Sequence, residues 1–389
     1  MNRRYYAGRD YRRALSIEEL RRVALRRLPR FEAEYLEGGA EDEVALRRNR
    51  TIFERISWVP RMLVGTGIPD LSRQVLGDAL HMPVVIAPTG FNGMLWPDGD
   101  LALARAADAS GIAFTLSTVS NYEVAALNAQ LKRPSWFQLY PLKDTRTADR
   151  LIDKAQEAGC TKLVVTVDVP ALGAREWDQR NYRRPLKLSV ASIVDVLLHP
   201  RWLTQVMLPK GAPKFANIAE FLPAGAQSAL QGVRFMGTQI NPGLCWADME
   251  RMRARWKGKF LLKGLLSVED AQRAAEIGCD GIVLGNHGGR QLDSCVTGIE
   301  VVGQVAAAVG DRLTILVDGG FRRGNDVLKA IALGADAVMI GRAPLYGLAA
   351  GGAAGVEHSL SLLRMEMERA LTLLGCHSLD ELGPQLIRA

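Results

Sequence analysis

The residues best suited to chemistry lie in one short stretch, 285–290, which reads Gly-Asn-His-Gly-Gly-Arg. It follows an apolar segment, 281–284, that is predicted to be a buried strand. Its glycines allow a tight turn and the close approach of a flat ligand. His287 offers a base, and Arg290 offers a guanidinium group that can pair with a carboxylate. This combination suits acid–base chemistry on an organic acid. A glycine-rich surface turn is the alternative that the stretch alone leaves open.

Eight short apolar segments are predicted to be buried strands, and amphipathic helical patterns separate most of them. Alternating strands and helices indicate a parallel sheet, and eight strands are the number that closes an α/β TIM (β/α)8 barrel. A doubly wound sheet is the alternative, weakened because no Gly-x-Gly-x-x-Gly pattern follows the first strand. The expected strands are 83–87, 113–117, 136–139, 163–167, 260–263, 281–284, 313–317 and 337–340, and the expected helices include 101–109, 147–158, 268–277 and 325–333.

Polar and titratable residues follow nearly every predicted strand. In a (β/α)8 barrel the carboxyl ends of the strands meet at one rim, where the active sites of such barrels lie. Separate segments therefore bring their polar residues to one place, which a purely structural barrel would not require. These residues are Pro88, Thr89, Gly90, Ser117, Gln138, Tyr140, Thr166, Asp168, Lys263, His287, Arg290, Asp318, Gly319, Gly320, Arg322, Gly341 and Arg342.

The loops after the seventh and eighth predicted strands indicate a phosphate site. Residues 318–324 read Asp-Gly-Gly-Phe-Arg-Arg-Gly and open a helix, and Gly341 and Arg342 follow the last strand. Backbone N–H groups and a helix N-terminus in these two loops often bind phosphate. Arg322 and Arg342 can add charge-assisted hydrogen bonds. The loops imply a phosphorylated cofactor or substrate, and surface arginines in tight turns are the alternative.

Length and composition indicate a soluble globular chain. Its 389 residues suffice for one large barrel or two ordinary domains. The five scattered cysteines are expected to be reduced and structural, in an intracellular protein. The N-terminus lacks the apolar core of a signal peptide, and no run approaches the roughly 20 apolar residues that span a bilayer. No metal site is expected.

Positive charge is concentrated in two segments. Residues 1–30 hold ten arginines against three acidic residues, and residues 180–214 hold seven basic residues against Asp195, although the net charge of the whole chain is only +7. Such patches suit anionic partners. No helix-turn-helix, RNP or zinc-finger pattern accompanies them, so no nucleic-acid partner is expected.

The connection after the fourth predicted strand is too long for one helix, so residues 176–230 are interpreted as an insertion. An apolar helix face beside basic residues and a tryptophan is typical of a segment that lies in a membrane interface. A lid over the site or an oligomer contact is the alternative. The residues that form this pattern are Val190, Ile193, Val194, Leu197, Leu198 and Trp202.

Residues 16–50 are predicted to form two short helices. Tyr35 lies one helical turn after Phe31, so packing is its simplest role. Residues 1–80 are accordingly interpreted as an N-terminal helical extension of a single domain, 1–389.

With these residues placed, the chain resembles the FMN-dependent L-2-hydroxy acid dehydrogenase and oxidase family, from about residue 8 to its last residue. Residues 88–105 are most similar to the membrane-associated members that oxidise (S)-mandelate. Residues 114–120 and 173–175 instead resemble the bacterial members that oxidise L-lactate. The strings that carry the family resemblance are 36–42, 136–140, 286–293 and 318–324.

The resemblance implies FMN bound across the mouth of the barrel. Lys263 would lie beside flavin N1 and O2, where an ammonium group suits the negative charge of the reduced ring. Asp318 would bind the ribityl hydroxyl groups. The remaining contacts would be Pro88, Thr89 and Gly90 on a ring face, Ser117, Gln138 and Thr166 at the ring edge, and Gly319, Gly320, Arg322, Gly341 and Arg342 around the phosphate.

The same resemblance assigns the substrate contacts. Arg175 and Arg290 would clamp the substrate carboxylate between two planar guanidinium groups. Tyr35 and Tyr140 would hydrogen-bond the carboxylate or the hydroxyl group of the substrate.

The catalytic set implied by the resemblance is His287, Asp168, Lys263 and Tyr140. His287 would be the base that starts oxidation at C2, and Asp168 would stabilise the imidazolium that forms. Whether His287 accepts the proton of C2 or that of the hydroxyl group is left open by the sequence.

Two glycines bear on the flavin and on the electron acceptor. Gly285 stands where many members carry serine, which predicts a retuned flavin potential or slightly weaker FMN binding. Gly90 stands where the oxidases usually carry alanine. That residue resembles the dehydrogenase branch, which passes electrons to a membrane quinone or carrier rather than to O₂.

These features together predict a dehydrogenase of an aromatic L-2-hydroxy acid such as (S)-mandelate. It would be a homotetramer bound peripherally to the cytoplasmic side of the inner membrane, with a quinone or another carrier as acceptor. An L-lactate dehydrogenase and a soluble cytoplasmic oxidase that makes H₂O₂ are the alternatives. An FMN-barrel isomerase is disfavoured because it would not need both Arg175 and Arg290 beside His287, and a silent membrane-surface scaffold is disfavoured by the complete acid–base set. Residues expected to line an apolar substrate pocket are Phe91, Met94, Leu95 and Trp177.

Overall fold

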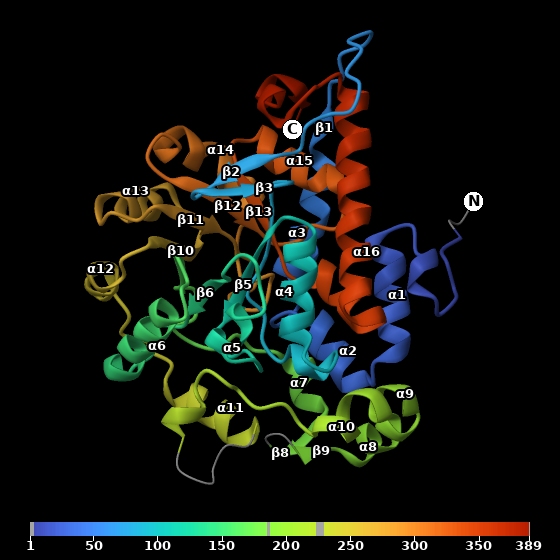
Figure 1. Ribbon diagram of the computed structural model, residues 1–389, viewed down its shortest axis with the longest axis vertical. Coiled ribbons are helices and arrows are strands. Elements are labelled where there is room, and N and C mark those ends of the chain that lie inside the picture. The colour runs from blue at the N-terminus through green and yellow to red at the C-terminus, as the bar shows by residue number, and fades with distance from the viewer. Residues whose placement is uncertain (1–3, 185–186, 223–228, 389) are drawn as a thin grey trace.

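Residues 4–184, 187–222 and 229–388 are described by a computed structural model of the protein (Figure 1). Its centre is a closed barrel of eight parallel strands. The strands follow one another around the barrel in chain order, and β13 pairs with β4 to close it. The predicted (β/α)8 barrel is confirmed, and the doubly wound alternative is wrong. The barrel strands are β4 (Val84–Ile86), β5 (Ala113–Ser117), β6 (Trp136–Leu139), β7 (Lys162–Thr166), β10 (Lys259–Leu265), β11 (Gly281–Leu284), β12 (Thr314–Asp318) and β13 (Ala337–Ile340).

Side chains fill the barrel interior and the space between the strands and the helices. Alternate residues of each strand point to opposite faces, so one set packs inside the barrel and the other packs under the helices. A hairpin, β2 (Arg73–Val75) and β3 (Asp78–Leu80), contributes Val75 and Leu80 to the interior cluster. The strand residues of that cluster include Val85, Val164, Leu261, Val283, Leu316 and Met339.

Helices surround the barrel, and the glycines that follow four of them end them as predicted. Gly111, Gly159, Gly278 and Gly334 all have positive φ angles, which glycine adopts at little cost. The outer helices are α4 (Gly99–Ala109), α5 (Val124–Asn128), α6 (Thr145–Glu157), α12 (Trp246–Arg255), α13 (Val268–Glu276), α14 (Gly298–Val309), α15 (Gly324–Ala332) and α16 (Arg342–Leu374), the last of which is interrupted at Gly351 and Gly352.

The N-terminal part differs from the prediction. It contains three helices before residue 52 instead of two: α1 (Ile17–Arg27), α2 (Arg30–Glu37) and α3 (Val44–Thr51). Residues 57–80 are not helical, because β1 (Ser57–Trp58) pairs with the C-terminal β14 (Ile387–Arg388) and the β2–β3 hairpin follows. Short 3-10 turns complete the description: η1 (Tyr11–Arg13), η2 (Ile52–Arg55), η3 (Asn92–Met94), η5 (Ala219–Phe221), η6 (Leu379–Glu381) and η7 (Pro384–Leu386).

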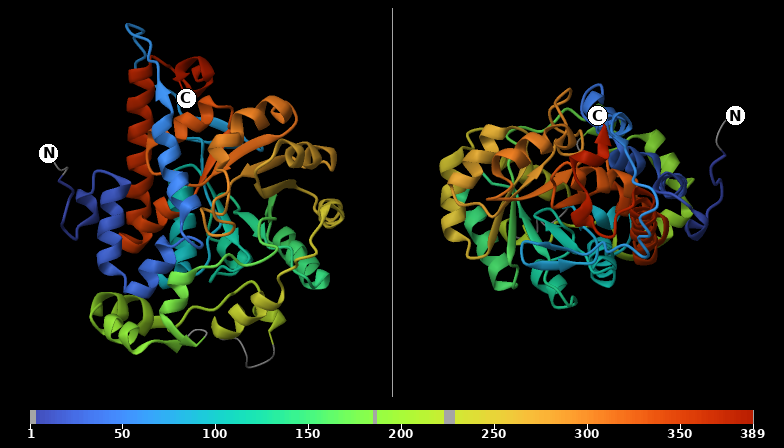
Figure 2. Two further views of the ribbon diagram at one scale, coloured as in Figure 1. Left: turned by 180° about the vertical axis from the view of Figure 1, so that it is seen from behind. Right: turned by 90° about the horizontal axis from the view of Figure 1, so that it is seen from above.

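The segment after β7 gathers at one end of the molecule, beside α2, as the views from both sides show (Figures 1 and 2). Arg30, at the start of α2, donates its backbone N–H to Asp195 of this segment. The elements of the segment are α7 (Glu176–Arg180), β8 (Tyr182–Arg184), β9 (Lys187–Leu188), α8 (Val190–Leu197), α9 (Pro200–Trp202), the π-helical turn η4 (Leu203–Met207), α10 (Leu208–Lys210) and α11 (Ala229–Thr238).

One face of α8 presents apolar side chains to the outside. They are between 48% and 73% exposed, so about half or more of the surface of each residue is open to solvent. Within residues 4–184, 187–222 and 229–388, no helix is long and apolar enough to cross a membrane. The exposed residues, here called the α8 apolar face, are Val190, Ile193, Val194, Leu197 and Leu198.

Trp202 does not belong to that face, contrary to its predicted place in the membrane interface. It is buried, its indole Nε1 donates to the carbonyl of Met94 at 2.8 Å, and its ring lies edge-on to Phe31 at 5.8 Å. The short α9 turns this side chain towards the barrel, so Trp202 anchors the segment instead of meeting a lipid surface.

Replacing Trp202 with alanine should therefore lower the free energy of unfolding by about 3–5 kcal/mol, the usual cost of removing a buried aromatic side chain. Denaturant unfolding of the purified protein, with limited proteolysis of residues 187–222, would measure it. Trp177→Ala is the matched control, because that ring is 42% exposed. Equal effects of the two variants would show that Trp202 is not the anchor.

Candidate active site

A cavity of about 840 Å³ lies at the carboxyl ends of the barrel strands. Its walls come from the strand ends, α2, the first turn of α16 and the segment after β7. The predicted convergence of polar residues at this rim is confirmed. The predicted site residues that line the cavity are Tyr35, Pro88, Thr89, Gly90, Tyr140, Thr166, Arg175, Lys263, His287, Arg290, Asp318, Gly319, Gly320, Arg322, Gly341 and Arg342.

Ser117 and Gln138 lie behind the cavity wall. Both are buried, at 2% and 1% exposure. Ser117 Oγ donates to Gln138 Oε1 at 3.0 Å, and Gln138 Nε2 donates to Thr166 Oγ1 at 2.9 Å. Of these three hydrogen-bonded residues, Thr166 is the one that lines the cavity. In this conformation the two side chains therefore orient the hydroxyl group of Thr166, and their direct contact with the flavin edge stays a prediction.

His287 and Asp168 form a hydrogen-bonded pair, with 2.9 Å between Nδ1 and Oδ1. Burial would raise the pKa of Asp168, but the charges of His287 and Lys263 and the hydrogen bond from His287 together lower it. Asp168 is therefore a carboxylate that can stabilise a positive charge on the imidazole ring. The second oxygen of Asp168, Oδ2, is buried and has no hydrogen-bond partner.

The backbone around His287 is held in an unusual conformation. His287, Gly288 and Gly289 all have positive φ angles, of 56°, 65° and 75°. A side-chain-bearing residue in this region is strained by roughly 1–2 kcal/mol, a cost often found at functional sites. Asn286 secures the turn, because its Oδ1 accepts from the Gly289 N–H at 3.1 Å and from Asn49 Nδ2 at 2.8 Å.

Lys263 supplies a buried positive charge at the base of the cavity. It is 4% exposed and forms an ion pair with Asp318, which lies across β11 on β12. Burial lowers the pKa of Lys263, but the carboxylates of Asp318 and Asp168 outweigh that effect and raise it. The side chain therefore stays an ammonium group that can face negative charge on a ligand.

Arg290 is fixed by the N-terminal helix α2. Its Nη1 donates to the carbonyls of Tyr35 at 2.8 Å and Gly38 at 2.6 Å, and its guanidinium carbon lies 5.1 Å from the centre of the Tyr35 ring. Arg175 Nε lies 3.4 Å from the carbonyl of Arg290. Burial, together with the nearby charges of Arg175 and Arg342, lowers the pKa of Arg290 to about 9. The two predicted clamp residues are thus adjacent, on the cavity wall.

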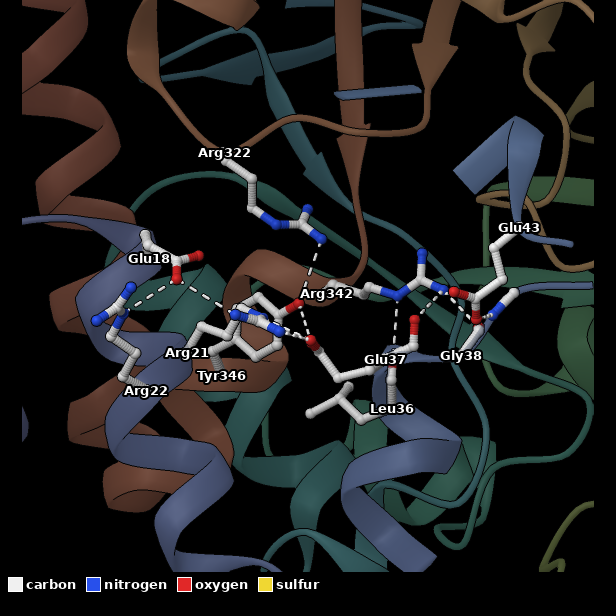
Figure 3. Close-up of polar contacts among 11 residues, drawn as sticks. Glu18, Arg21, Arg22, Leu36, Glu37, Gly38, Glu43, Arg322, Arg342 and Tyr346 are labelled. Atoms are coloured by element: carbon white, nitrogen blue, oxygen red, sulfur yellow. Dashed lines mark hydrogen bonds and ion pairs between the residues drawn. The ribbon is translucent and has the colours of Figure 1, made fainter. Parts of the chain in front are cut away.

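Arg342 and Arg322 take part in a network around the end of α2 (Figure 3). Arg342 donates to the carbonyls of Leu36 at 2.8 Å and Gly38 at 2.9 Å, so its side chain holds α2 against the barrel. Arg322 Nη2 lies 3.4 Å from Tyr346 Oη. The predicted contacts of both arginines with a phosphate group stay predictions, since Arg342 in particular uses its donors on backbone carbonyls.

The groups that line the cavity fit FMN. A Cβ atom added at Gly341 would meet only Thr89 Cγ2, at 3.8 Å, so there is open space beside the first turn of α16. The positive end of that helix, with Arg322 nearby, suits a phosphate group. The buried ammonium group of Lys263 and the polar edge at Thr166 suit the isoalloxazine ring.

Gly285 has too little room for a larger side chain unless its neighbours shift. A Cβ atom would lie 2.9 Å from the carbonyl oxygen of Asp318 and 3.1 Å from its Cβ. The close packing of the loops after β11 and β12 therefore accounts for glycine at this position. The predicted effect on flavin potential or FMN affinity stays a prediction.

The apolar part of the cavity differs from the prediction. Phe91 and Met94 line it, as expected. Leu95 and Trp177 do not line the cavity, contrary to the prediction. Leu95 is buried in the core, and Trp177 is 42% exposed. Residues that sequence reasoning missed come mainly from the segment after β7, whose irregular elements gave no strand-end signal. They include Val169, Leu172, Val196, Leu203, Met207, Phe215, Val233 and Met236, with two acids, Glu32 and Asp178.

Comparison of the chain with known proteins supports an FMN site in this cavity. Residues 24–389 match the FMN-dependent dehydrogenase family. The chain is 42% identical over 374 residues to (S)-mandelate dehydrogenase of Pseudomonas putida, covering 96% of this chain and 93% of that protein. It is 39% identical over 374 residues to L-lactate dehydrogenase of Alcaligenes faecalis, covering 96% and 98%. The crystal structure of the monotopic membrane protein (S)-mandelate dehydrogenase matches with a TM-score of 0.92 at 42% identity, covering 97% of this chain and 99% of that chain.

The chain therefore belongs to the FMN-dependent dehydrogenase family. It is an enzyme that uses FMN to oxidise L-2-hydroxy acids.

Replacing Asp168 with asparagine should slow reduction of the bound flavin by substrate by about 10²–10⁴-fold, because His287 loses the carboxylate that stabilises its protonated form. Anaerobic stopped-flow absorbance of the flavin would measure the rate. His287→Ala should be at least as slow, and both variants should retain FMN. A near-normal rate in either variant would remove that residue from the acid–base chemistry.

Proposed function

We propose that this enzyme oxidises an aromatic L-2-hydroxy acid such as (S)-mandelate to the 2-oxo acid at a membrane surface. The observation that carries the substrate proposal is the apolar wall beside the arginine pair. Phe91 and Phe215 lie with ring centres 4.6 Å apart, and Tyr35 lies edge-on to Phe91 at 5.9 Å. Met94 and Met207 line the same cavity. Burial of a phenyl group against such a wall contributes more binding free energy than burial of a methyl group.

Arg175 and Arg290 would bind the substrate carboxylate, and Tyr35 and Tyr140 would hydrogen-bond the carboxylate or the hydroxyl group. Burial raises the pKa of Tyr140, and the charge of Asp168 adds to this effect, so the phenol stays a hydrogen-bond donor. Two guanidinium groups and two phenols can fix the C2 centre in one orientation, which is a major part of catalysis.

His287 would take a proton from the substrate through Nε2, because Nδ1 is engaged with Asp168. The charged Asp168 would stabilise the imidazolium. FMN, when bound, supplies the acceptor for the two electrons removed from C2. Lys263 would place its positive charge where negative charge develops on the ring.

The membrane part of the proposal is supported by the α8 apolar face and the basic residues around it. Arg180, Lys187 and Arg201 are exposed. The predicted contributions of the Arg183, Arg184 and Lys210 side chains lie outside the described part of the chain. An apolar face a few residues wide with basic neighbours suits a peripheral site on an anionic lipid surface. The relative of similar structure described as a monotopic membrane protein supports a location at the membrane. A quinone or other carrier in that membrane would be the electron acceptor.

An L-lactate dehydrogenase is the second candidate, because the relative from Alcaligenes faecalis is nearly as similar in sequence. A homotetramer also stays a prediction, which sedimentation analysis of the detergent-solubilised protein can test.

Anaerobic flavin bleaching with a panel of acids tests the substrate. (S)-Mandelate should reduce the bound flavin with a kcat/KM at least about tenfold above that for L-lactate, the difference expected from burying a phenyl group. (R)-Mandelate should leave the flavin oxidised. Faster reduction by L-lactate would contradict the aromatic assignment and favour the second candidate. Admitting air afterwards separates the two kinds of acceptor, since slow reoxidation is expected of a dehydrogenase.

Replacing both Val194 and Leu198 with glutamate should release the enzyme from membranes while leaving dye-linked activity within about twofold, because the two side chains lie outside the cavity and charge opposes insertion. Sedimentation with vesicles of anionic lipid would measure binding. Leu373→Glu is the matched control, a 66% exposed leucine one residue before the end of α16. Equal sedimentation of the double variant and the wild type would contradict the membrane proposal.

A further inference from the structure

Two acidic side chains in the cavity wall have no part in the chemistry described above. Glu32 on α2 is 4% exposed, and Asp178 on α7 lies in the same wall. One oxygen of each, Glu32 Oε2 and Asp178 Oδ1, is buried without a hydrogen-bond partner. Buried acids in this state reduce stability, so their presence at a binding site calls for a functional explanation.

Asp178 lies beside the arginine pair. Its Oδ2 is 3.9 Å from Arg290 Nη2. Within the described part of the chain, Asp178 is the acidic residue at ion-pair distance from Arg290. No described acidic residue lies at that distance from Arg175. Burial raises the pKa of Asp178, while the charges of Arg290 and Arg175 oppose that rise. An ionised Asp178 beside the two guanidinium groups would leave this cluster with a net charge of +1.

Glu32 lies one helical turn before Tyr35, so both side chains are on the same face of α2. Burial, reinforced by the charge of Asp178, raises the pKa of Glu32 to about 8. Glu32 is therefore uncharged at neutral pH and becomes an anion above about pH 8. The other titratable groups that face this cluster are Glu34 and Tyr35 on α2, Tyr140 after β6, Arg175 before α7, Tyr182 in β8, Arg290 after β11 and Arg342 at the start of α16.

We infer that Asp178 and Glu32 set the charge at the arginine end of the cavity, Asp178 as the counter-ion at ion-pair distance from Arg290 and Glu32 as a second buried acid in the same wall. The site is thereby matched to 2-hydroxy acids with a single carboxylate. An ionised Glu32 would add negative charge to the same cavity wall and oppose binding of any anion. Loss of Asp178 would leave a charge of +2, which suits a dicarboxylate. Asp178 acts through Arg290, and Glu32 acts through the charge of the cavity wall, so both are positioning residues and neither is a catalytic residue. The inference rests on the proposed assignment of these arginines to the substrate carboxylate.

Glu32→Gln tests the neutral acid, because glutamine keeps the shape and cannot ionise. The probe is benzoylformate, a 2-oxo acid that the FMN-loaded enzyme does not oxidise, titrated by calorimetry between pH 6 and pH 10. Wild-type affinity should fall about fivefold between pH 7 and pH 9 as Glu32 ionises. The Glu32→Gln enzyme should match the wild type at pH 7 and keep its affinity until Arg290 begins to lose its charge. Superimposable pH profiles would overturn the role of Glu32.

Asp178→Asn tests the counter-ion through selectivity. The ratio of the dissociation constants of benzoylformate and oxalate should shift about tenfold towards the dicarboxylate, since one more positive charge is uncompensated. Asp178→Glu should restore the wild-type ratio. An unchanged ratio in the asparagine variant would overturn the inference, and if that variant does not fold, the pH profile of Glu32→Gln decides.

Arg290→Lys separates failure of this inference from failure of the proposed function. If benzoylformate binds the wild type and Arg290→Lys equally well, or binds neither, the arginine assignment is wrong and the inference falls with it. If binding depends on Arg290 but the Glu32 and Asp178 variants behave like wild type, only the inference is wrong.

Discussion

The hydrogen bond between His287 and Asp168 is the interaction around which the rest of the site is arranged. It joins the loops after β11 and β7, two strands separated by β10, so it depends on the order β7, β10, β11 in the barrel. The positive φ angles at residues 287–289 turn the imidazole ring into the cavity. Gln291 supports the partner, because its Nε2 donates to the carbonyl of Asp168 at 2.9 Å. The base and its carboxylate are thus oriented before any ligand arrives.

The helix α2 completes the site from outside the barrel. Carbonyls at its C-terminal end bind Arg290 and Arg342, and its side chains Glu32 and Tyr35 line the cavity. Carbonyls at a helix C-terminus carry partial negative charge, so they suit these guanidinium groups. The start of α2 contacts the segment after β7 through Arg30 and Phe31. One short helix therefore connects the arginine pair to the segment proposed to meet the membrane.

Much of this arrangement follows from the sequence because two strong regularities act together. Buried parallel strands read as apolar runs, and the barrel brings their carboxyl ends to one rim, so His287, Lys263 and Asp318 could be placed together without a structure. Side-chain direction within irregular segments has no such regularity. Trp202 was predicted at a membrane surface because its neighbours are basic and apolar, yet the short α9 turns it inward. Residues 57–80 were assigned to a helical extension, although they form short strands that pair with segments no local pattern reveals.

The acids Glu32 and Asp178 escaped prediction for a related reason. Glu32 lies on a charged helix and Asp178 in an irregular segment, where acidic residues usually face solvent. Their burial depends on how α2 and α7 pack against the cavity, which is a tertiary property. The family motifs drew attention to Arg175 and Arg290, and the charge that surrounds those arginines became visible only in the fold.

A crystal structure of the FMN-loaded enzyme with benzoylformate bound would test the central claim most directly. We expect the carboxylate of the ligand to lie between Arg175 and Arg290. We also expect His287 Nε2 to lie within hydrogen-bonding distance of the C2 oxygen while Nδ1 remains on Asp168. A ligand bound with its carboxylate away from both arginines, or a His287 ring turned away from C2, would contradict it.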